Sequence, residues 1–178
     1  MKKFFDVFPA LKVEAKARQF LEEAMVERVS ATKKQDFLRV YIVSDRLIEK
    51  EYIWKAEQGI EKMLPSFQVR VKIYEKYHLS SQYNPEKLME VYRNSILLEL
   101  KEYSPVEYNL FKNGDISYPQ EDKMVLTIEE SVPARSRSGE LVRVLEKIYN
   151  ELVILDFALK YLKILIDSTD CTDNTDKN

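Results

Sequence analysis

The amino-acid sequence predicts an α+β protein made of two small domains. Segments with helical apolar spacing alternate with short runs of β-branched and aromatic residues along most of the chain. The 178 residues suffice for one ordinary domain or two small ones, and 45% of them are hydrophobic while 33% are charged. A polar segment at residues 78–84 divides the pattern. We therefore expect domains at residues 1–77 and 85–167, joined by a linker at 78–84 and followed by a disordered tail at 168–178.

The first domain is expected to have a three-stranded sheet with helices packed on one face. Its clearest strand is FLRVYIV, which is rich in aromatic and β-branched residues. A run of apolar residues at spacings of three and four predicts a helix that Pro65 ends. The expected elements are a helix at 13–24, strands at 26–32 and 37–43, a helix at 48–64 and a strand at 68–74 that closes the unit near Tyr77.

The second domain begins with a strong helix-start signal. Asn84 is a good N-cap and Pro85 suits the first helical position, so a helix is expected to about Glu102. The run SPVE from Ser104 resembles a capping box with proline at its first position, and it predicts a second short helix that Asn113-Gly114 stops. The remaining expected elements are a hairpin of strands at 115–118 and 123–129, and a long helix that opens at Pro133 or Ser138.

Leucine and isoleucine recur near the C-terminus with the alternating spacings of a heptad repeat. Two interpretations fit this pattern. The repeat either forms one long helix that makes a homodimer or binds a partner, or it belongs to a core helix that breaks near Asn150 and is followed by a buried strand such as 152–155. The repeat comprises Leu141, Leu145, Ile148, Leu152, Leu155, Leu159, Leu162 and Ile166.

The composition excludes several kinds of site. One cysteine, Cys171, leaves no intramolecular disulfide or cysteine-rich zinc site, and three scattered glycines leave no glycine-rich phosphate loop. The single histidine, His78, lies in the expected linker. The sequence therefore predicts no catalytic residue, no metal site and no cofactor. Because no export or membrane-spanning segment is evident, we expect a cytoplasmic protein.

Two groups of residues are candidates for binding. Arg135 and Arg137 lie near the start of the last helix, where two guanidinium groups and free backbone amides would suit a phosphate, although an exposed basic loop is the favoured explanation. The formal net charge of −2 argues against a strongly basic nucleic-acid clamp. For a protein partner, the candidate interface residues are Trp54 and its neighbour Tyr52, together with Leu152, Leu155 and Leu159 of the heptad.

Residues 1–151 resemble the N-terminal region of PolC-type DNA polymerase III, the replicative polymerase of low-GC Gram-positive bacteria. No matching segment is a catalytic signature, so the resemblance depends on the number and the order of the segments. They are FFDVFP at 4–9, LRVYIVS at 38–44 with RLI at 46–48, VKI at 71–73, YNPEKLMEVY at 83–92, SILLEL at 95–100, YSPVEYNLF at 103–111 and ELVRVLEK at 140–147.

The resemblance implies a specific architecture and role. The first domain would be similar to the C-terminal domain of the tau clamp-loader subunit, and the second would resemble a type II K-homology fold ending in a long helix. The polymerase and exonuclease domains of the family have no counterpart in these residues, so the chain is expected to be a non-catalytic replisome module that binds tau. The second domain lacks the Gly-x-x-Gly loop of nucleic-acid-binding K-homology domains, and this argues against nucleic-acid binding. Weak binding of single-stranded nucleic acid is the alternative function.

Overall fold

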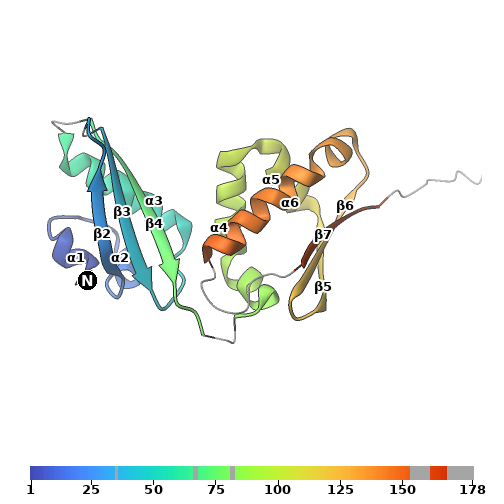
Figure 1. Cartoon of the computed structure of the whole chain (residues 1–178), viewed down its shortest axis with the longest axis horizontal. Helices are drawn as coiled ribbons and strands as arrows, with labels where there is room; N and C mark the ends of the chain where they lie inside the picture. The colour runs from blue at the N-terminus through green and yellow to red at the C-terminus, as the bar shows by residue number, and fades with distance from the viewer. Residues whose placement is uncertain (35, 66–67, 81–82, 153–160, 168–178) are drawn as a thin grey trace, which may run out of the picture.

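The computed structural model of the chain describes residues 1–34, 36–65, 68–80, 83–152 and 161–167. Within them lie two separate β-sheets, each with its own set of helices (Figure 1). The first part contains β1 (Lys2–Lys3), α1 (Phe4–Val7), α2 (Ala15–Leu21), β2 (Met25–Ala31), β3 (Phe37–Ser44), α3 (Lys50–Met63) and β4 (Arg70–Tyr77). The second contains α4 (Pro85–Tyr103), α5 (Pro105–Asn113), β5 (Asp115–Gln120), β6 (Lys123–Glu129), α6 (Val132–Leu152) and β7 (Tyr161–Asp167).

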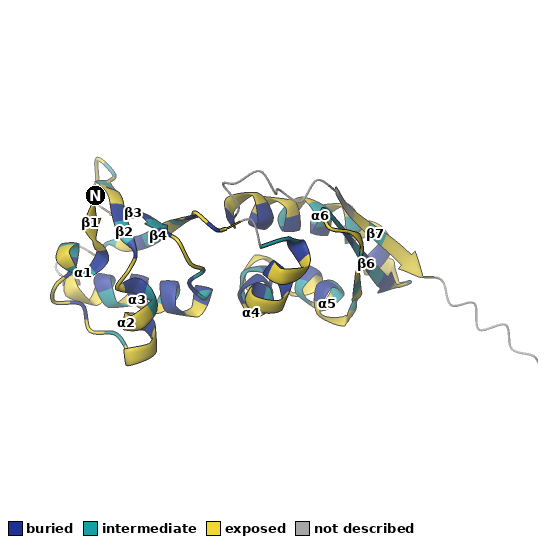
Figure 2. Cartoon of the chain, turned by 90° about the horizontal axis from the view of Figure 1, so that it is seen from below, coloured by how far each residue is buried: buried dark blue, intermediate teal, exposed yellow. Residues whose placement is uncertain are grey.

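The first sheet has the strand order β1-β2-β3-β4, with β3 and β4 parallel and the other pairs antiparallel. Helices α1, α2 and α3 lie on one side of it (Figure 2). Val40, Ile42 and Ile73 point from the sheet into this layer and are fully buried. The sequence predicted three strands, and the fourth, β1, was missed because two residues are too short to show a period.

The second sheet has the order β5-β6-β7, with β5 antiparallel and β7 parallel to β6. Met124, Leu126 and Ile128 alternate along β6 and are buried against the helices. The helix starts follow the sequence signals: the Asn84 side chain accepts a hydrogen bond of 2.8 Å from the backbone N–H of Lys87 at the start of α4. Both domains are therefore α+β, as expected.

Of the two interpretations of the heptad repeat, the single long helix through residue 166 is wrong, because residues 161–167 form a strand. Helix α6 ends at Leu152, close to the break considered at Asn150, and β7 occupies 161–167; apart from Leu152, the strand considered at 152–155 lies outside the described residues. Strand β7 pairs in register with β6, and the heptad positions 162 and 166, four residues apart, fit the period of a strand as well as a heptad spacing. Leu155, Leu159 and the tail at 168–178 lie outside the described residues.

The heptad residues of α6 pack inside the second domain. Leu141 and Leu145 are fully buried, and Ile148 and Leu152 are only 4% exposed. These side chains therefore belong to the core of this domain, which is the second interpretation of the repeat, and they do not form a free dimerisation seam.

The two domains meet where β4 and the start of α3 approach α4 and the end of α6. Tyr77 and Tyr92 are buried here, and the Tyr77 hydroxyl donates a hydrogen bond of 3.2 Å to the carbonyl oxygen of Ile48. Leu79, in the connection between the domains, is 4% exposed. This junction contains the largest concentration of buried charge in the described part of the chain, and we take it as the candidate site.

Candidate functional site

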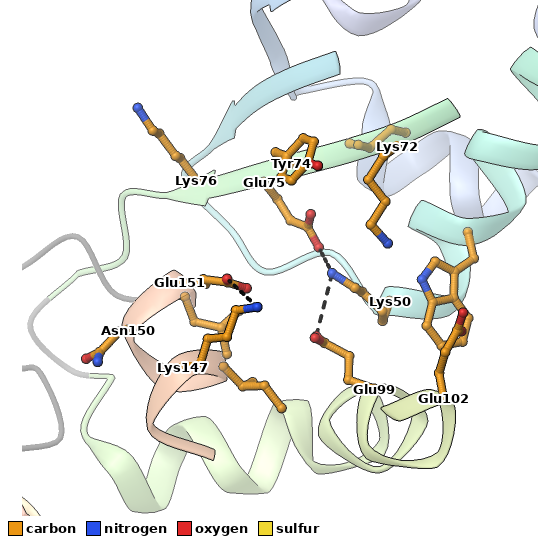
Figure 3. A pocket seen from close by; sticks show the side chains of 14 residues that line it. Lys50, Lys72, Tyr74, Glu75, Lys76, Glu99, Glu102, Lys147, Asn150 and Glu151 are labelled. Atoms are coloured by element: carbon orange, nitrogen blue, oxygen red, sulfur yellow. Dashed lines mark hydrogen bonds and ion pairs between the residues drawn. The ribbon is translucent and has the colours of Figure 1, made fainter. Parts of the chain in front are cut away.

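Lys50 is the centre of the junction. It is the first residue of α3, and its backbone N–H, which has no partner within the helix, donates a hydrogen bond of 3.0 Å to the Ser95 hydroxyl of α4. Its ammonium nitrogen lies 2.5 Å from Glu75 Oε1 on β4 and 3.6 Å from Glu99 Oε1 on α4 (Figure 3). One residue thus connects the helix and strand of the first domain to a helix of the second.

The charges of this cluster are largely removed from water. Lys50 is 8% exposed, and the side chains of Glu75 and Glu99 are 7% and 21% exposed. Burial alone would lower the pKa of Lys50, but the two nearby carboxylates outweigh it and the pKa is raised. Burial also raises the pKa of Glu99, against the opposing effect of Lys50. The cluster therefore holds its ammonium group charged and ties the domains together.

A pocket of about 610 Å³ opens beside the cluster, between β4 and α3 on one side and α4 and α6 on the other (Figure 3). Its apolar and aromatic lining comes from Trp54, Ile73, Tyr74, Ile148 and Leu152, of which Trp54 is half-buried. Its charged lining is balanced, with four lysines and four glutamates: Lys50, Lys72, Lys76, Lys147, Glu75, Glu99, Glu102 and Glu151. An apolar floor within a rim of paired charges suits an apolar side chain of a protein partner better than a free anion.

The structure brings two of the expected interface residues together and separates a third. Trp54 and Leu152, far apart in the sequence, both line the pocket. Tyr52 is 5% exposed on the opposite side of α3, where its ring stacks on Phe20 with centroids 5.4 Å apart. Tyr52 therefore packs in the core of the first domain, and the period of the helix explains why two residues so close in sequence diverge.

The two arginines proposed for nucleic-acid contact both have carboxylate partners. Arg135 pairs with Glu130, and Arg137 contacts Glu107 Oε1 through two nitrogens at 2.6 Å. Glu107 is completely buried, so the expected capping box is only half formed: Ser104 accepts from Val106 N–H, while the Glu107 carboxylate turns to Arg137. The Ser104 amide already donates to the Leu100 carbonyl at the end of α4.

Sequence reasoning missed Lys50, Glu75 and Glu99. One signal pointed to the first of them, because a cation in the first turn of a helix opposes the helix dipole and needs compensation from elsewhere. The two glutamates carried no such signal, since each lies in an ordinary amphipathic element.

The described residues contain no group of three or more His, Cys, Asp or Glu side chains arranged to hold a metal ion. Among the described helices, none is both long enough and apolar enough to span a bilayer.

A comparison with protein families matches the first part of the chain. Residues 3–73 match the model described as DNA polymerase III polC-type N-terminus I. This range runs from β1 into β4 and covers nearly all of the first domain. No curated protein and no solved structure matches the chain.

Proposed function

Because residues 3–73 match the family model of the PolC-type DNA polymerase III N-terminus I, we propose that this chain serves DNA replication as a non-catalytic protein-interaction module, with the tau clamp-loader subunit as its partner. The observation that carries the proposal is the family match in the first domain. The expected place of action is the cytoplasm, where a replicative polymerase of this type works.

The junction pocket is the part of the surface that best suits a protein partner. It is lined by the half-buried Trp54 and by the buried side chain of Leu152, with lysine and glutamate side chains around them. Interface hot spots are enriched in tryptophan, and they lie in apolar pockets that a polar rim shields from water. A partner would therefore insert an apolar side chain beside Trp54 and pair its own charges with Lys147 and Glu151 at the rim.

The same proposal extends to the fold of each domain. The first domain is taken as similar to the C-terminal domain of tau, and the second as a type II K-homology fold. Supporting this are the α+β layer of the first sheet, with its helices on one side, and the mixed three-stranded sheet of the second, in which one strand pair is parallel.

Binding of the purified chain to tau, to the polymerase core and to the sliding clamp tests the proposal. We expect a complex with tau at micromolar concentration, measured by isothermal titration calorimetry, and a roughly tenfold or greater loss of affinity for Trp54→Ala. Lys147→Glu, at an exposed rim position, gives a second variant that leaves the fold intact. Val132→Ala is the matched control, because Val132 is 82% exposed at the opposite end of α6.

Failure of all three proteins to bind at micromolar concentration would overturn the proposed function. Equal losses for Trp54→Ala and Val132→Ala would instead show that the partner binds elsewhere, and would remove the pocket from the proposal. Circular dichroism of each variant establishes that the loss of affinity does not come from unfolding.

A further inference from the structure

The first sheet has one face without helices. Alternate residues of β3 and β4 point into the helix layer, while the residues between them point the other way. On the open face, Arg39, Tyr41 and Val43 of β3 lie beside Lys72, Tyr74 and Lys76 of β4, in register across the parallel pair. Figure 2 shows α1, α2 and α3 gathered on the other side of this sheet.

Aromatic rings and a guanidinium group form a row across three strands of this open face. The rings of Tyr41 and Tyr74 stack with centroids 5.1 Å apart and planes at 17°. The Arg28 guanidinium of β2 lies 4.3 Å from the centroid of Tyr41 on its other side. Tyr74, at the end of the row, is 41% exposed. Because the stack already fixes the side chain of Tyr74, its exposed planar ring can bind a ligand without losing further conformational entropy.

The charges of the open face are mainly positive. Five cations, Arg28, Arg39, Arg70, Lys72 and Lys76, accompany one carboxylate, Glu27, at the bulge of β2. Lys76 lies 3.5 Å from Glu27, and Lys72 lies 3.7 Å from Glu57 at the edge of the sheet.

Arg28 and Arg39 are exposed and pair with no carboxylate among the described residues. Their close neighbours are aromatic rings, Tyr41 for Arg28 and Phe37 for Arg39. Both guanidinium groups therefore keep their hydrogen-bond donors available for a ligand.

We propose that this open face binds single-stranded nucleic acid. The cations match the charge of the phosphates, and the exposed tyrosine offers a surface on which a base can stack, which is how single-strand binders combine charge with aromatic platforms. An acidic protein segment would use the cations but would have no need of the ring. Because the whole chain carries a net charge of −2, binding through the cations of this face is expected to be weak and strongly dependent on salt.

The proposal goes beyond the protein-binding function and is separable from it. Arg28 and Arg39 do not line the junction pocket, whereas Lys72, Tyr74 and Lys76 of the open face do, so the arginine variants are the ones that leave the proposed partner site intact. Loss of nucleic-acid binding with tau binding retained, or the reverse, tells the two apart.

Fluorescence anisotropy with a labelled oligo(dT) of about 20 nucleotides tests the proposal on the full chain. At about 50 mM salt we expect saturable binding, and the slope of log K against log salt should fall in magnitude by about 1.4 in Arg28→Ala/Arg39→Ala, because each phosphate contact on a single strand contributes about 0.7. The matched control is Lys12→Ala/Lys62→Ala, which removes two exposed cations from the helix side and should leave the slope unchanged.

The aromatic contribution needs its own pair of variants. Tyr74→Leu should weaken binding about tenfold without changing the salt slope, and Tyr74→Phe should restore it, because stacking requires the ring and not the hydroxyl. A flat titration with the wild-type chain would overturn the proposal. So would equal effects of the two double-alanine variants, or displacement of the oligonucleotide by polyglutamate at equal charge concentration, which would identify an acidic protein as the ligand.

Discussion

Removing the ammonium group at the junction should destabilise the chain far more than removing a similar one at the surface. In Lys50→Ala, the carboxylates of Glu75 and Glu99 lose the cation that lies 2.5 and 3.6 Å from them. Breaking a buried ion pair on one side costs about 3–5 kcal/mol, and the 21% exposure of the Glu99 side chain lets water relieve part of this. We therefore expect a loss of about 3 kcal/mol in the free energy of unfolding.

Urea denaturation followed by the fluorescence of Trp54, the one tryptophan of the chain, measures this loss at the junction itself. Thermal denaturation should show a midpoint about 6–12 °C lower. Lys55→Ala is the matched control: Lys55 lies on the same helix and also contacts two glutamates, Glu14 and Glu51, but all three side chains are exposed. Exposed pairs contribute little, so this control should unfold like the wild type.

Two results would refute the reasoning. One is a loss below about 1 kcal/mol for Lys50→Ala, which is the range of exposed ion pairs. The other is an equal shift in Lys55→Ala. A triple variant, Lys50→Met with Glu75→Gln and Glu99→Gln, should recover most of the stability, because it removes the unpaired charges along with the cation.

Three further predictions concern other buried contacts. Arg137→Ala should cost about 3 kcal/mol because it leaves the fully buried Glu107 without a counter-charge, and urea denaturation would contradict this if the midpoint did not move. Burial raises the pKa of Glu57 above 4.5, so the folded state binds more protons just above pH 4.5 and stability from this group falls as pH rises through that window. Glu57→Gln should therefore gain stability relative to wild type at pH 7 but not at about pH 4.5, and identical pH profiles would refute this. Gly114→Ala should destabilise by about 1–3 kcal/mol because its Cβ would meet a leucine methyl at 2.6 Å, while Gly139→Ala, with open space around it in α6, should stabilise by about 0.5–1 kcal/mol. Shifts of the same sign for both glycines in thermal denaturation would contradict the packing argument.

Sequence signals predicted secondary structure correctly where the interactions involve only neighbouring residues. The N-cap at Asn84, the proline starts of α4 and α5 and the alternation along β4 depend on a few neighbouring residues, and each predicted its element to within a few positions. The C-terminal repeat failed for a related reason. A spacing of four, such as that between positions 162 and 166, fits one face of a helix and also one face of a strand, and only pairing with β6 in register decides between the two.

The amino-acid sequence by itself determined that this chain is α+β, which helices begin where, and that its first part resembles a polymerase N-terminus. The tertiary structure alone decided that Lys50 meets Glu75 and Glu99, that Arg137 meets Glu107, and that Trp54 and Leu152 share a pocket. Secondary structure follows from interactions a few residues apart, whereas each of these contacts joins elements that only the packing of two sheets and their helices brings together.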